Sequence, residues 1–160
     1  MTTANIHSQK ILILDFGSQY TQLIARRVRE LGVYCEIWDY AVDEQLFWEF
    51  DPQGVIFSGS PESANHDESP RPPEFIYAAG KPILGICYGM QTMAEHFSGK
   101  VEASSKSEFG FAQVDVIAPN KLLDGIEDRV NEKAAPQLDV WMSHGDKVTE
   151  VPPGFSLIAQ

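Results

Sequence analysis

The chain has 160 residues, about the length of one globular domain, and its 43% apolar residues supply enough side chains for an ordinary core. Its formal net charge of -11 opposes binding to phosphate backbones, so nucleic acid is not an expected partner. The two cysteines form no disulfide framework, and no apolar run reaches the roughly 20 residues that span a bilayer. We therefore expect a cytoplasmic domain that holds no metal and no cofactor of its own.

The first half of the sequence alternates between strand and helix patterns. Residues 11–16 form a short apolar run, typical of a strand that is covered on both faces. The helical pattern that follows ends at Gly32. The alternation then continues through a strand over 34–40, a helix over 43–50, a strand over 54–59, a short helix from Glu74 and a strand over 82–86. Such repeats predict β-α-β units and a parallel sheet.

The second half of the sequence is rich in strand patterns. These are VEASS, FAQVDVI, DVWMS, DKVTE and FSLIA, with one short helical piece near Leu122. Together the two halves predict an α/β fold: an open, mostly parallel, doubly wound sheet with flavodoxin-like layering, followed by a β-rich part. In such a sheet the functional site lies at the carboxyl ends of the strands, where Cys87 and the Ser58-Gly59 turn both fall.

Cys87 lies between two glycines in Gly85-Ile86-Cys87-Tyr88-Gly89, the small-x-nucleophile-x-small pattern of a nucleophile elbow. The helix expected after it, with an apolar stripe of Met90, Met93, Ala94 and Phe97, points its N-terminus at the sulfur and favours a thiolate. A buried structural cysteine is the ordinary alternative, but it does not explain the two glycines. Cys35, by contrast, shares a strand face with Val33 and Ile37 and is predicted to be core.

A thiolate that attacks a carbonyl needs hydrogen-bond donors for the oxyanion. The backbone N–H of Tyr88, directly after the nucleophile, is the natural first donor. Gly59, in the turn after a buried strand, is a candidate for the second donor, because a glycine lets a backbone amide approach closely. Gln91 is one helical turn after Cys87 and could position a substrate.

The general base is harder to identify among the four histidines His7, His66, His96 and His144. His7 and His66 have the character of surface residues, and His96 is nine residues along the helix from Cys87, roughly 13 Å at 1.5 Å per residue. His144, in a turn between two strand patterns, is the best internal candidate.

Three segments carry a resemblance to a known family: residues 11–36, 84–104 and 139–148. They resemble the class I glutamine amidotransferase domain that forms the N-terminal part of GMP synthetases, nearly end to end. The resemblance implies that Cys87 is the nucleophile and that Gly59 and Tyr88 supply the oxyanion N–H groups. It further implies that Gln91, Ser143, Gly145 and Asp146 hold the glutamine substrate. One departure is Ser60, where the family usually has a glycine.

In that family the catalytic histidine and glutamate lie in a His-x-Glu segment toward the end of the domain. The one His-x-Glu of this sequence, His66-Asp67-Glu68, is instead in the acidic loop after Gly59, and none occurs toward the end of the chain. We therefore expect residues 1–160 to be a glutaminase domain truncated before that segment, without the ATP pyrophosphatase domain of its parent. The resemblance implies hydrolysis of glutamine to glutamate and ammonia. It also implies a synthetase domain of the same parent chain that uses ATP and magnesium to aminate XMP to GMP, and a homodimer formed through the absent C-terminal part.

Two other functions stay open at this point. The chain could be a module that binds glutamine or a synthetase partner and turns nothing over, which the missing base favours. It could instead be a cysteine hydrolase of the same architecture that acts on peptides or glutamyl conjugates, with Cys87 and an internal base such as His144. Dependence on glutamine separates the last function from an amidotransferase.

Overall fold

The computed structural model describes residues 9–66 and 68–160, apart from the side chains of residues 104–109, 143 and 144. The chain divides into two compact units, Met1–His96 and Phe97–Gln160, each with its own sheet. The expectation that residues 1–160 form a single domain stays a prediction. No helix in the described residues is long and apolar enough to cross a membrane.

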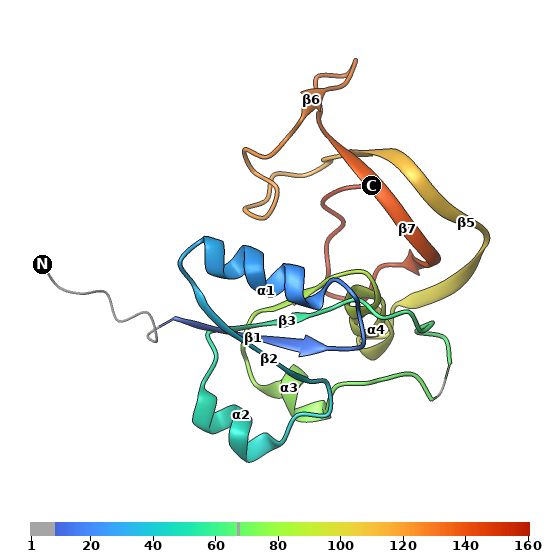
Figure 1. Ribbon diagram of the computed structural model, residues 1–160. Coiled ribbons are helices and arrows are strands. Elements are labelled where there is room, and N and C mark those ends of the chain that lie inside the picture. The colour runs from blue at the N-terminus through green and yellow to red at the C-terminus, as the bar shows by residue number, and fades with distance from the viewer. Residues whose placement is uncertain (1–8, 67) are drawn as a thin grey trace, which may run out of the picture. The chain divides into compact units, whose positions relative to one another are not determined.

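The first unit is built on a parallel sheet with the strand order β2-β1-β3-β4 (Figure 1). The strands are β1 (Lys10–Asp15), β2 (Tyr34–Asp39), β3 (Gly54–Phe57) and β4 (Ile83–Gly85). This confirms the predicted parallel α/β sheet. β4 is shorter than the predicted strand over 82–86, and its Leu84 is 39% exposed because the described part of the sheet ends at this strand.

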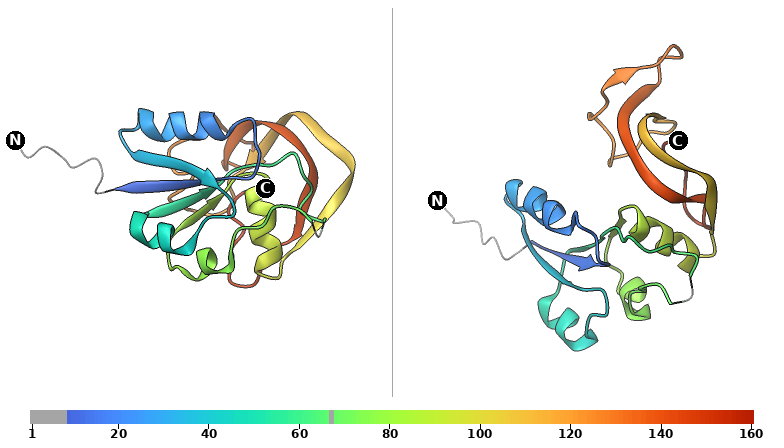
Figure 2. Two further views of the ribbon diagram at one scale, coloured as in Figure 1. Left: turned by 60° about the horizontal axis from the view of Figure 1, so that its bottom comes forward. Right: turned by 45° about the vertical axis from the view of Figure 1, so that its right-hand side comes forward.

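Helices cover both faces of this sheet, as a doubly wound fold requires (Figure 2). Helix α1 (Thr21–Glu30) packs Ala25 against Ile13 and Cys35, which confirms Cys35 as a core residue. On the other face lie α2 (Glu44–Phe50) and α3 (Glu74–Ala78). There the ring of Phe57 makes an edge contact with that of Tyr77, at 5.7 Å between centroids. The predicted stop at Gly32 is confirmed by its φ of +76° directly after α1.

The carboxyl ends of the four strands lie at one edge of the sheet because the strands are parallel and nearly in register. Asp15 pairs with Asp39, Leu14 with Phe57, and Phe57 with Gly85. The turn after β1, the Ser58-Gly59 turn after β3 and Cys87 after β4 therefore all leave the sheet at this edge.

A sharp turn joins β4 to helix α4 (Tyr88–His96), and Cys87 stands in it with a φ of +53°. This left-handed conformation strains a non-glycine residue by roughly 1–3 kcal/mol. The turn needs both glycines: a Cβ on Gly85 would lie 2.6 Å from the Met90 nitrogen, and one on Gly89 would lie 2.5 Å from the Phe57 Cβ. Main-chain hydrogen bonds hold it to β3, from Ile86 N–H to the Phe57 carbonyl and from Gly89 N–H to that of Ser58. The predicted nucleophile elbow thus has its expected backbone.

The buried face of α4 differs from the predicted stripe. Tyr88, Gly89, Gln91, Thr92 and Ala94 are buried, whereas Met90 is 47% exposed. The close approach of Gly89 to Phe57 fixes which side of this short helix faces the core, and Met90 is directed elsewhere.

The second unit is an antiparallel sheet of β5 (Lys100–Asp115), β7 (Pro136–Glu150) and β6 (Arg129–Val130), in the order β5-β7-β6. The β-rich prediction is confirmed, and the four strand patterns from VEASS to DKVTE merge into two long strands. The helical piece near Leu122 is wrong, because Pro119 and the left-handed Gly125 leave too few residues for a helix. The strand predicted at FSLIA is reduced to a single bridge between Val116 and Ala159.

We predict that Gly89→Ala lowers the free energy of unfolding by about 2 kcal/mol or more, since its Cβ would overlap the backbone and side chain of Phe57. Urea denaturation followed by circular dichroism measures this. Gly59→Ala is the matched control, because a Cβ there meets nothing closer than 3.5 Å. Equal denaturation midpoints for Gly89→Ala and the wild type would contradict the packing described here.

A second prediction concerns Tyr77, whose ring also stacks on His96 at 3.6 Å between centroids. Burial raises the pKa of Tyr77 from 10.0 to about 12. The unfolded chain therefore releases the Tyr77 proton at a lower pH than the folded chain does. The contribution to the free energy of unfolding that is present below pH 10 is lost as the pH rises toward 12. Urea denaturation between about pH 9 and about pH 11 should show a steeper fall for the wild type than for Tyr77→Phe. Tyr20→Phe, at a residue 59% exposed, serves as the control and should leave the slope unchanged.

Candidate active site

Cys87 is exposed although Tyr88, the residue that follows it, is buried, so the cysteine is open to a reactant. Its carbonyl accepts hydrogen bonds from the N–H groups of Met90 and Gln91, at 3.0 and 3.1 Å, which starts α4 directly after the cysteine. The Tyr88 N–H, in the first turn of that helix, has no acceptor within the described residues. A free donor therefore lies one residue from the thiol.

Gly59 lies beside Cys87. A Cβ built on Gly59 would be 3.7 Å from the Cys87 Cβ and 3.5 Å from the Ser18 Oγ. The Gly59 N–H, like that of Tyr88, finds no acceptor in the part of the chain that the structure describes. The structure thus brings two unpaired main-chain donors, one from the turn after β3 and one from the start of α4, close to Cys87.

Ser58 holds the Gly59 turn in place, a role that its position in the sequence did not predict. Its hydroxyl accepts from the Phe16 N–H at 3.0 Å and donates to the Gly59 carbonyl at 2.9 Å, and its side chain is completely buried. It therefore links the ends of β1 and β3. The available signal was a serine at the end of a buried strand, since a buried hydroxyl needs a partner.

The turn between β1 and α1 forms another side of this region. The Asp15 carboxylate accepts from the Gly17 N–H at 2.9 Å and from the Thr21 hydroxyl at 2.8 Å. The Ser18 Oγ accepts from the Tyr20 N–H at 3.0 Å. These bonds give the segment DFGSQYT a defined shape and place Ser18 next to Gly59, a position that the sequence did not predict.

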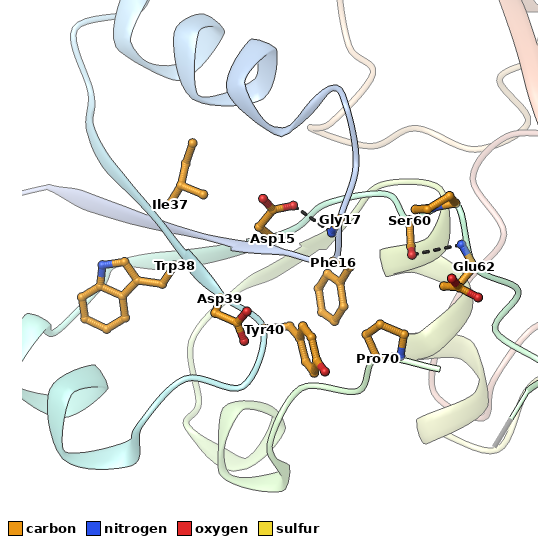
Figure 3. A pocket seen from close by; sticks show the side chains of 11 residues that line it. Asp15, Phe16, Gly17, Ile37, Trp38, Asp39, Tyr40, Ser60, Glu62 and Pro70 are labelled. Atoms are coloured by element: carbon orange, nitrogen blue, oxygen red, sulfur yellow. Dashed lines mark hydrogen bonds between the residues drawn. The ribbon is translucent and has the colours of Figure 1, made fainter. Parts of the chain in front are cut away.

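A pocket of about 580 Å³ opens at the carboxyl ends of β1 and β2 (Figure 3). Its lining is aromatic and acidic and includes the start of the loop after Gly59. The residues are Asp15, Phe16, Gly17, Ile37, Trp38, Asp39, Tyr40, Ser60, Pro61, Glu62 and Pro70. Phe16 and Tyr40 stack in it, at 5.7 Å between centroids. Cys87 is not part of this lining.

Ser60 fits the turn after Gly59 without backbone strain, because its φ is not positive. Its hydroxyl accepts from the Glu62 N–H at 3.1 Å, as Figure 3 shows. A serine in place of the usual family glycine is thus accommodated here.

The other predicted substrate-binding residues divide between the two units. Gln91 is in the first unit, one turn after Cys87, with its side chain 4% exposed. Ser143, Gly145 and Asp146 are in the second unit, on β7, where Asp146 pairs with Ala103. The Ser143 side chain is outside the described residues, and the substrate contacts of all four stay predictions.

The structure describes two histidines of the first unit, His66 and His96. His96 stacks on Tyr77, and its Nδ1 is 3.6 Å from the Glu74 carboxylate at the far end of α4, as its distance along the helix predicts. His66 is exposed, and its carbonyl accepts from the Ser69 N–H in the loop after Gly59. His7 and the side chain of His144 are not described. Within the described residues, no three His, Cys, Asp or Glu side chains are grouped as metal ligands.

Sequence comparison relates the chain to GMP synthases. It is 62% identical over 158 residues to the glutamine-hydrolysing GMP synthase of Alteromonas mediterranea, and 60% identical over 157 residues to that of Photorhabdus laumondii. These matches cover 99% and 98% of this chain but 30% of each relative. The chain therefore spans less than a third of the length of these curated relatives.

Solved structures share the fold. A protein assigned to the GMP synthases, from Thermoplasma acidophilum, matches with a TM-score of 0.78 and 29% identity, over 94% of this chain and 72% of that one. A glutamine amidotransferase from Thermotoga maritima matches with a TM-score of 0.69 and 20% identity, over 94% of this chain and 66% of that one. The family model for glutamine amidotransferase class-I matches residues 12–160. The chain belongs to the class-I glutamine amidotransferase family.

Proposed function

We propose that the chain is the glutaminase part of a GMP synthase, in which Cys87 attacks the side-chain amide of glutamine. The observation that carries this proposal is the exposed thiol on a strained elbow, with the unpaired N–H groups of Gly59 and Tyr88 nearby. Such a set stabilises an oxyanion, which acyl transfer from an amide requires. The GMP synthases at 60–62% identity support the choice of glutamine.

The reaction proceeds in two steps. The Cys87 thiolate forms a C–S bond with the γ-carbonyl carbon, and the oxygen carries the negative charge while Gly59 and Tyr88 donate to it. When the C=O bond re-forms, the C–N bond breaks and ammonia leaves after its nitrogen has accepted a proton. Water then attacks the γ-glutamyl thioester, the C–S bond breaks, and glutamate and the thiol are released.

The proton for the departing nitrogen needs a general acid. His96 is excluded by its position at the far end of α4. We expect the acid to be the histidine of the C-terminal His-x-Glu pair that the resemblance implies, with its glutamate as the orienting group, although no His-x-Glu follows residue 68 in this sequence. Gln91, Ser143, Gly145 and Asp146 are proposed to bind the glutamine.

The ammonia released from glutamine is the nitrogen source for the synthesis of GMP in this proposal. We expect it to pass to a synthetase domain that uses ATP and magnesium to aminate XMP, in a cytoplasmic homodimer. The identity of 62% to a glutamine-hydrolysing GMP synthase supports the expected synthetase domain. The ATP and magnesium would belong to that synthetase domain, so this chain's own share is the release of ammonia.

Cys87→Ala in the complete protein should lower glutamine hydrolysis by at least 10³-fold, because the covalent route is lost. Glutamine-dependent GMP formation should fall equally, whereas formation from added ammonium should persist. The assays are glutamate release and GMP formation with each nitrogen source. Cys35→Ala is the matched control, since its thiol is buried and donates to the Ala25 carbonyl. Unchanged glutamine hydrolysis in Cys87→Ala would overturn the proposal.

A further inference from the structure

The loop over residues 60–73 continues directly from Gly59, and two side chains fasten it to α4, the helix that follows Cys87. We propose that Arg71 is a positioning residue of the active site: it fixes the loop that continues from one proposed oxyanion donor, Gly59, against the helix that carries the other, Tyr88. This inference rests on the proposed function, and it concerns a residue to which neither the sequence nor the family match gave a role.

Arg71 joins the loop to the helix through three acceptors. Its Nη1 donates to the Thr92 hydroxyl at 2.6 Å, and its Nη2 donates to the Glu95 carboxylate at 2.6 Å and to the Ala64 carbonyl. Thr92 and Glu95 are three residues apart on α4 and so share a face. Ala64 and Thr92 are both 1% exposed, so two of the three acceptors are buried.

The second fastening comes from Tyr88, the residue whose N–H is a proposed donor. Its hydroxyl donates to the Pro70 carbonyl at 2.5 Å, and its ring is 1% exposed. Pro70 directly precedes Arg71, so both fastenings hold the same short piece of the loop. The end of the loop is thereby tied to the first and last turns of α4.

The sequence around Arg71 suits a rigid fastening. Prolines at 70, 72 and 73 restrict the backbone to extended conformations, so little backbone conformational entropy is lost when this segment is held against α4. A guanidinium presents several N–H donors in a fixed plane and can serve three acceptors, which an ammonium on a flexible stem matches poorly. Arg27 joins no two segments of the chain, because its ion pair with Glu30 lies within α1 at the surface.

Loss of this fastening should impair the transition state more than the binding of glutamine. The Gly59 and Tyr88 donors act together on one developing oxygen, and a shift of about 1 Å between them can lower the rate by about 10²-fold. We therefore expect Arg71→Met to lower kcat for glutamine hydrolysis by roughly tenfold to a hundredfold, with KM changed less than about threefold.

The test compares four variants of the complete protein: Arg71→Met, Arg71→Lys, Glu95→Gln and the surface control Arg27→Met. Each is assayed for kcat and KM in glutamine hydrolysis and for the rate at which a chloromethyl ketone analogue of glutamine alkylates Cys87. In that step the thiolate displaces chloride and a C–S bond forms. Alkylation by iodoacetamide, which needs no oxyanion donors, reports whether the thiol itself is still reactive.

The inference predicts that Arg71→Met loses kcat and reactivity toward the ketone while it keeps its rate with iodoacetamide. Arg71→Lys and Glu95→Gln should lose less, and Arg27→Met nothing. Equal kcat in Arg71→Met and the wild type would overturn the positioning role. An equal fall in the rates of alkylation by the ketone and by iodoacetamide would also overturn it, because it would show general unfolding. Should Arg71→Met fail to fold, the comparison of Glu95→Gln with Arg27→Met decides in the same way.

A different outcome would overturn the proposed function itself. In that case the chloromethyl ketone would not label Cys87 of the wild-type protein, or added glutamine would not slow the labelling.

Discussion

The left-handed backbone at Cys87 is the constraint on which the candidate site depends. This conformation puts the thiol on the outside of a turn between a strand and a helix, and it persists only because neighbouring groups enforce it. Gly85 and Gly89 leave room for the backbone of α4 and for Phe57, and the carbonyls of Phe57 and Ser58 accept the N–H groups on either side of Cys87. The contacts of Ile86 and Gly89 are made to β3 or to the turn that follows it, so the nucleophile is positioned by the strand that also leads to Gly59.

The two proposed oxyanion donors are therefore held by the same set of main-chain contacts. Gly59 follows β3, Tyr88 begins α4, and α4 is hydrogen-bonded to the end of β3. Ser58 adds a link from this point to β1. Buried polar groups that are fully paired in this way hold one geometry, and a preorganised geometry is what electrostatic stabilisation of an oxyanion requires.

The sequence allowed prediction of the features that depend on local pattern. The apolar run at 11–16, the stop at Gly32 and the glycines around Cys87 each have a local physical cause, and the sheet, α1 and the elbow follow from them. The contacts between distant segments were not predictable. Nothing in the segment SPRPP indicates that Arg71 reaches α4, and the pattern at Met90 gave no sign that Gly89 sets the buried face of the helix.

The dependence of the elbow on β3 also bears on the order in which the chain folds. The bond from Gly89 N–H to the Ser58 carbonyl joins residues far apart in sequence, as does the parallel pairing of β3 with β4. Contacts of this kind form slowly, because a long loop must close before any of them is made. We expect the elbow to form only after β3 and β4 have paired, so in a partly folded chain Cys87 would not yet be held in its left-handed turn.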